Sequence, residues 1–156
     1  MEKDKTAIFM GLRDEILRSK AEDLNIQLDS ASRVWGVVTD IAMQTGSVCV
    51  VALINGSARM YFSSGGKVIA GVEQGNVRDA ATKYTRMCYK SLPEMKITRE
   101  FPLPRAGEVS FYLLTNNGVY TSSAKKEELV SGQNILAPMF FAANDLVTQF
   151  GIIKQK

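Results

Sequence analysis

The sequence predicts an α+β fold in which a five-stranded antiparallel sheet, in the order α-βββ-α-ββ-α, carries helices packed on its faces. Short segments with apolar residues at alternate positions are joined by Asn55-Gly56 and Asn116-Asn117-Gly118, turn sequences typical of tight β-hairpins. Other segments carry apolar residues at three- and four-residue spacing, the pattern of a helix with one buried face. A sheet made of hairpins and covered by such helices is the simplest arrangement that buries both patterns.

The first helix is predicted over residues 4–20, with Asp4 as its N-cap. Its apolar stripe consists of Ile8, Phe9, Leu12, Ile16 and Leu17. The whole chain, residues 1–156, is expected to be a single domain, and residues 1–32 are the only piece that could detach from it. If the sheet leaves this helix uncovered, its stripe would offer a surface for dimerisation.

Three strands are predicted next. In residues 33–42 one set of alternate positions is apolar apart from Thr39, and Val34 and Val38 indicate that the other face is partly covered too. Gly36 is expected to allow close approach of another backbone. Residues 48–54 are apolar almost throughout, which is typical of a central strand buried on both faces. Residues 58–63 alternate again and complete a three-stranded meander through the Asn55-Gly56 turn.

The middle helix gives the clearest pattern in the chain. Asn76 is its expected N-cap and Pro93 its expected terminator. Its apolar stripe consists of Val77, Ala80, Ala81, Tyr84, Met87, Cys88 and Leu92. After a loop over residues 93–108, two more strands are predicted at residues 109–115 and 119–123, followed by a short helix at 125–130 and a last helix that begins near Pro138.

The glycine-rich turn before the middle helix is the candidate binding site. It comprises Ser63, Ser64, Gly65 and Gly66, and Lys67 and Arg78 would assist it. One interpretation is a tight connection from strand to helix, because adjacent glycines accept positive φ at little cost. The other is an anion site in which backbone N–H groups and a helix N-terminus face a phosphate or carboxylate. The spacing matches neither a P-loop nor a dinucleotide-binding fingerprint.

The composition excludes several chemistries. The chain has no histidine, which removes histidine-dependent triads and imidazole-bound zinc. Cys49 and Cys88 lie on apolar faces and are expected to be buried free thiols. No catalytic residue, metal site or cofactor is therefore predicted, and an enzymatic role is the less favoured alternative.

The basic residues of the middle region are expected to form a solvated surface. Residues 59–105 hold nine basic and four acidic side chains within a chain of net charge +3. The nucleic-acid candidates are Lys83, Arg86, Lys90, Lys96, Arg99 and Arg105, with Tyr84 and Tyr89 interleaved. Because Tyr84 belongs to the apolar stripe, few aromatic side chains remain for base stacking, and nucleic-acid binding is not expected.

The segments YFSSGGKVIAG, FPLP and FYLLT resemble a group of uncharacterised bacterial proteins. The layout is also similar to profilin-like and roadblock-type domains, which implies a dimerising adaptor, although three strands rather than two precede the middle helix here. With no signal peptide and no membrane-spanning run, a cytoplasmic protein is predicted. The leading functional hypothesis is a non-enzymatic, homodimeric protein-interaction or regulatory module. The alternative is a small-ligand domain that binds an anion or phosphate at residues 63–66.

Overall fold

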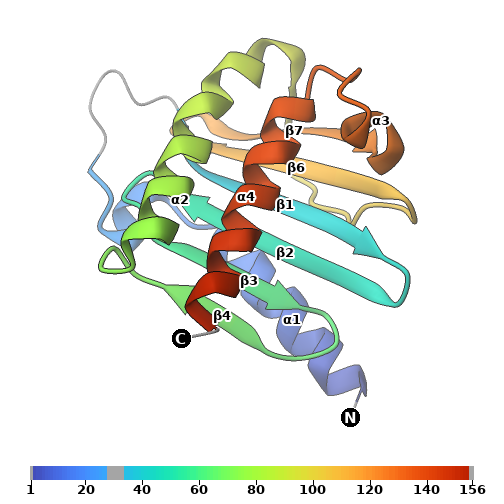
Figure 1. The fold of residues 1–156 in the computed structure, drawn as a ribbon, viewed down its shortest axis with the longest axis horizontal. Coiled ribbons are helices and arrows are strands. Elements are labelled where there is room, and N and C mark those ends of the chain that lie inside the picture. Colours follow the sequence, from blue (N-terminus) through green and yellow to red (C-terminus); the bar gives the residue numbers. More distant parts are fainter. Residues whose placement is uncertain (1, 28–33, 155–156) are drawn as a thin grey trace.

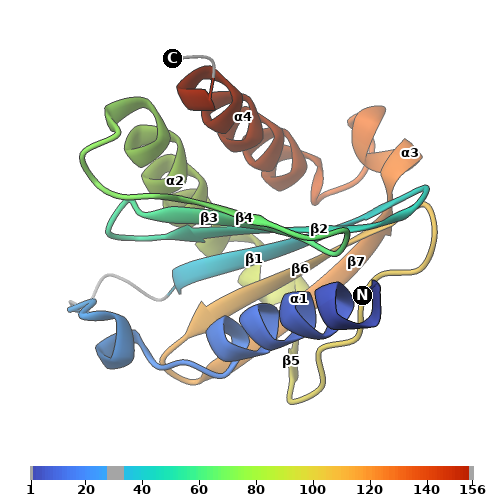
Figure 2. The same cartoon turned by 90° about the horizontal axis from the view of Figure 1, so that it is seen from below.

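The computed structural model describes residues 2–27 and 34–154. The described residues form one seven-stranded antiparallel sheet with the strand order β4-β3-β2-β1-β6-β7-β5 (Figure 1). Helices α2 and α4 lie side by side on one face of this sheet, and helix α1 lies across the other face (Figure 2). The predicted α+β class, with an antiparallel sheet and helices on its faces, is therefore confirmed.

The elements have the following bounds. The strands are β1 Val34–Met43, β2 Gly46–Leu53, β3 Ala58–Phe62, β4 Lys67–Ala70, β5 Lys96–Thr98, β6 Glu108–Thr115 and β7 Gly118–Lys125. The helices are α1 Glu2–Leu17, α2 Gly75–Met87, α3 Lys126–Val130 and α4 Ala137–Lys154, with short 3-10 helices at Ala21–Leu24 and Cys88–Glu94.

The predicted number of strands was wrong, because the two edge strands, β4 and β5, were not recognised. The apolar run at residues 68–70 folds back on β3, so four strands precede α2. Residues 63–66 therefore connect strand to strand, with positive φ at Gly65 and Gly66, and do not lead into a helix. At the opposite edge, β5 pairs with β7 inside the segment that was predicted to be a loop. Each strand is too short for alternation alone to identify it.

Two predicted helix caps were also wrong. Helix α2 begins at Gly75, and the Asn76 amide donates a hydrogen bond to the side-chain oxygen of Gln149 on α4, at 3.1 Å. Asp4 lies inside α1, which begins at Glu2. Pro93 lies within the 3-10 helix that continues α2. The contact between α2 and α4 thus engages the Asn76 side chain, which the local sequence assigns to a helix cap.

The sheet separates two apolar clusters. The cluster under α2 and α4 includes Val37, Val50, Phe111, Tyr84 and Leu146. The cluster under α1 includes Phe9, Ile16, Trp35, Val38 and Tyr112. Strand β2 contributes buried side chains to both, as its apolar sequence predicts. Helix α1 finds cover on the sheet for most of its stripe, and Ile8, which is 63% exposed, is the exception.

Gly36 on β1 leaves space mainly for the side chains of neighbouring strands, and less for a neighbouring backbone. A Cβ atom at this position would lie 2.9 Å from a methyl carbon of Leu53 and 3.0 Å from one of Leu114. The nearest backbone atom, the carbonyl oxygen of Ala52, would be 3.5 Å away. The glycine therefore lets two leucines from the neighbouring strands close over β1 on the α1 side.

Candidate binding surfaces

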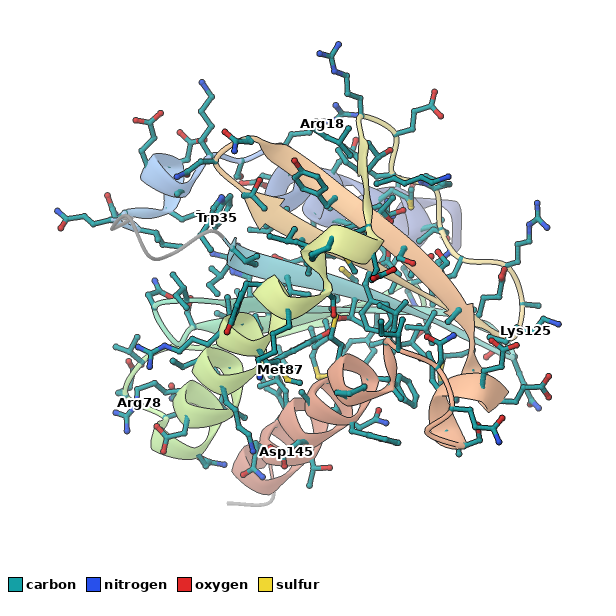
Figure 3. All side chains as sticks on the ribbon, turned by 90° about the horizontal axis from the view of Figure 1, so that it is seen from above. Arg18, Trp35, Arg78, Met87, Lys125 and Asp145 are labelled. Atoms are coloured by element: carbon teal, nitrogen blue, oxygen red, sulfur yellow. The ribbon has the colours of Figure 1, made fainter. Side chains whose placement is uncertain are left out.

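The structure divides the predicted site residues between the two ends of β3. The turn of residues 63–66 and Lys67 follow β3, whereas Arg78 lies beside the turn that precedes it. A Cβ atom on Gly56, in that preceding turn, would be 2.5 Å from Cγ of Arg78. Five strand residues separate the two turns, a distance of about 15 Å. Figure 3 shows Arg78 projecting from α2, on the far side of the sheet from Arg18. Lys67 and Arg78 are therefore too far apart to hold one small anion.

Ser63 has a structural role in the turn. Its hydroxyl oxygen accepts a hydrogen bond from the N–H of Ser47 at 2.8 Å. Its own N–H donates to the carbonyl oxygen of Ser47 at 3.0 Å. These two bonds tie the end of β3 to the start of β2, so the Ser63 hydroxyl is already engaged.

The other predicted site residues of the turn line a groove against α1, which we call the α1–turn groove. Its volume is about 430 Å³, and its lining residues are Lys5, Ile8, Phe9, Leu12, Phe62, Ser64, Gly65, Gly66 and Lys67. A Cβ atom on Gly65 would lie 3.1 Å from Cδ of Lys5, so the Lys5 stem crosses the turn where the glycine leaves space. The groove joins the N-terminal half of α1 to the β3–β4 hairpin, which sequence spacing could not show.

Both charged residues that line this groove are lysines. Lys5 lies on α1 and Lys67 at the start of β4, so they approach the groove from its two sides. Within residues 2–27 and 34–154, neither lysine forms an ion pair with a carboxylate. The α1–turn groove thus combines apolar walls with net positive charge.

The free edge of β4 is a second surface. The N–H of Phe62 donates to the carbonyl oxygen of Gly66, which fixes the alternation of the ladder between β3 and β4. The hydrogen-bonded pairs are then Met60 with Val68 and Ala58 with Ala70. The backbone groups of Lys67 and Ile69 consequently point away from β3, toward the open edge. The side chain of Ile69 is 58% exposed.

A buried ion pair lies between α1 and the sheet. Arg13 Nε donates to Asp40 Oδ2 at 2.9 Å, and Arg13 Nη2 donates to the carbonyl oxygen of Pro102 at 3.3 Å. The guanidinium also stacks 5.6 Å from the ring centre of Tyr112. Burial raises the pKa of Asp40 above its ordinary value, although the hydrogen bond from Arg13 opposes this rise.

Arg13 is not a member of the apolar stripe predicted for the first helix, yet it is fully buried. The one signal for its true position was Asp40, an acid on a strand face otherwise made of Val34, Gly36 and Val38. A carboxylate on a covered face needs a partner. Both charges are enclosed, so the pair serves to hold α1 and offers no open reactive group.

The outer side of α2 carries a third surface. A shallow depression of about 780 Å³ is lined by Ile54, Asn55, Arg78, Asp79, Thr82, Lys83, Arg86, Met87, Tyr89 and Lys90. Tyr89 is exposed there, but Tyr84 is buried and its hydroxyl bonds to that of Thr39. A single exposed aromatic ring gives little for successive bases to stack on.

No group of three or more histidine, cysteine, aspartate or glutamate side chains in the described ranges could hold a metal ion. None of the helices within those ranges has the length and apolar character needed to cross a membrane. A scan against protein-family models, a search of curated proteins and a search of solved structures each found no match.

Proposed function

We propose that this protein is a non-catalytic interaction module that forms a homodimer through the free edge of β4. The observation that carries the proposal is the exposed Ile69 on an edge strand whose outer backbone groups point away from β3. Edge strands with apolar side chains and free N–H and C=O groups are templates for pairing with another strand.

The alternation of the β4 ladder defines how two copies would meet. Two β4 strands running antiparallel can place Lys67 opposite Ile69 of the second copy, and Ile69 opposite the second Lys67. This register satisfies four outward backbone groups on each strand and places a two-fold axis at Val68. Val68 then faces its own counterpart, and no lysine lies directly opposite another lysine, an arrangement that would be unfavourable.

The other edge of the sheet is less suited to pairing. Strand β5 has three residues, and the charged Arg99 and Glu100 follow it directly. Ile97 is 60% exposed, but its side chain lies over Gly118, where an added Cβ atom would be 3.1 Å away. Short strands bordered by charges are a common protection against edge-to-edge association. We therefore assign the dimer contact to β4.

The test measures molar mass in solution by light scattering and analytical ultracentrifugation. Ile69→Lys puts like charges into the contact, and Ile69→Pro removes an outward N–H without touching the ladder to β3. We expect a dimer for the unmodified protein and monomers for both variants. Ile97→Lys, at the opposite edge, is the matched control and is expected to stay dimeric.

Two results would overturn the proposal. One is a monomeric unmodified protein at concentrations up to about 100 μM. The other is a dimer that persists in both Ile69 variants, which would place the contact elsewhere. Circular dichroism of each variant checks that the fold is retained.

A further inference from the structure

We propose that the α1–turn groove binds an amphipathic carboxylate, a molecule with an alkyl or aryl chain that ends in a carboxylate. This role differs from dimerisation, since the groove is formed by α1 and the β3–β4 turn and shares only Lys67 with β4. It also differs from the phosphate site that the glycine-rich turn suggested, because the lining of the groove is mainly apolar.

The apolar part of the ligand is defined by the walls. Phe9 and Leu12 on α1 supply apolar side chains to the groove, and Ile8 stands exposed at its side. Phe62 also lines the groove, although its side chain packs against the apolar cluster on the other face of the sheet. The volume of about 430 Å³ falls within the range of about 300–1,000 Å³ that is typical of small-molecule sites. A hydrocarbon chain in the groove would cover Ile8, and removing this apolar surface from water favours binding.

The charged end of the ligand is defined by Lys5 and Lys67. One lysine comes from α1 and the other from the start of β4, and no acidic residue lines the groove. Asp4, the neighbour of Lys5 in sequence, is not part of the lining. A carboxylate at the mouth can accept charge-assisted hydrogen bonds from both lysines, whereas a cationic head group would be repelled.

The glycines of the turn keep the groove open. Gly65 leaves the space that the Lys5 stem occupies, and a Cβ atom on Gly66 would have no heavy atom within 4 Å. Gly65 has a φ of 116°, which a residue with a side chain rarely adopts. The Ser64-Gly65-Gly66 sequence is thus explained by the close approach of α1 as well as by the hairpin.

The test uses decanoate as the probe and isothermal titration calorimetry as the measurement. Decyltrimethylammonium has the same chain with the opposite charge, and acetate has the charge without the chain. We expect decanoate to bind and both comparison molecules to bind at least about tenfold more weakly, since each lacks one of the two interactions.

The variants separate the two halves of the site. Lys5→Met removes one charge but keeps an unbranched stem, and Ile8→Gln makes the exposed wall polar. Each is expected to weaken decanoate binding by about tenfold, the factor that corresponds to about 1.4 kcal/mol. Lys83→Met, on the outer side of α2, is the matched control and should bind decanoate as the unmodified protein does. Because Lys5 and Ile8 are exposed, both variants are expected to fold.

The proposal is overturned if decanoate does not bind, if decyltrimethylammonium binds equally well, or if Lys5→Met and Ile8→Gln leave its affinity unchanged. Binding of an acidic amphipathic peptide but not of decanoate would also overturn it, in favour of a protein partner. Failure here is distinguishable from failure of the dimer, because Lys5→Met leaves β4 intact and Ile69→Lys leaves the groove lining intact.

Discussion

Arg13 and Asp40 form an ion pair across the interface between α1 and β1, with Nη2 of Arg13 2.8 Å from Oδ2 of Asp40. Both side chains are 0% exposed. Arg13 Nη1 and Asp40 Oδ1 have no hydrogen-bond partner in the part of the chain that the structure describes. Two enclosed charges tolerate little displacement from each other, so the pair fixes both the rotation and the position of α1 on the sheet.

Removing one member of this pair is predicted to be strongly destabilising. Asp40→Leu leaves the Arg13 guanidinium buried without a counter-charge, which costs about 3–5 kcal/mol. The double variant Arg13→Met, Asp40→Leu removes both charges and should recover most of that loss, because apolar side chains of similar size often replace a buried pair without net cost. Urea denaturation of the unmodified protein, the two single variants Arg13→Met and Asp40→Leu, and the double variant completes a double-mutant cycle. If the double variant loses as much stability as the two single variants combined, the prediction is contradicted.

The loss of stability caused by Arg13→Met is predicted to depend on pH. Burial already raises the pKa of Asp40, and the loss of Arg13 removes the interaction that opposes this rise. A raised folded-state pKa contributes stability that is present below the unfolded pKa and is lost as the pH rises. The difference in unfolding free energy from the unmodified protein should therefore be larger at about pH 7 than at about pH 4.5. An equal difference at both pH values would show that Asp40 is not titrating.

Gly11 is predicted to lower the stability of α1. It lies in the helix, is exposed, and has no heavy atom within 4 Å of an added Cβ atom. Gly11→Ala should raise the unfolding free energy by about 0.5–1 kcal/mol, because alanine loses less backbone entropy on folding. Thermal or urea denaturation measures the gain. Unchanged or lower stability would mean that α1 contributes little to cooperative folding.

The two thiols are predicted to be unreactive in the folded protein. Cys49 and Cys88 are 0% exposed, and burial raises the pKa of both thiols. Because the thiolate is the nucleophile, iodoacetamide should modify them only when the chain opens. Labelling followed by mass spectrometry should give rates that increase with urea in parallel with unfolding. Fast labelling of either thiol in native conditions would contradict this burial.

The turn residues of the candidate groove could be predicted from the sequence, but the apolar and charged residues that α1 adds to it could not. The pair of glycines and Lys67 were recognised as special because their pattern is local. Lys5 and Ile8 were missed as members of the same site, since only the packing of α1 on the sheet brings them to the turn. Arg78 was placed with the turn because it is near in sequence, yet β4 separates the two by returning along β3.

Features that depend on neighbouring residues could be predicted from the amino-acid order alone: the apolar run within β2, the hairpin at Asn55-Gly56, where Gly56 has a φ of 93°, and the buried stripe of α2. Packing between distant segments, in contrast, makes residues 67–70 a sheet edge and turns Arg13 inward to Asp40. Local periodicity reports which side chains avoid water. Which strand a short segment joins, and which charge a helix buries, depends on the free energy of contacts between residues far apart in the chain.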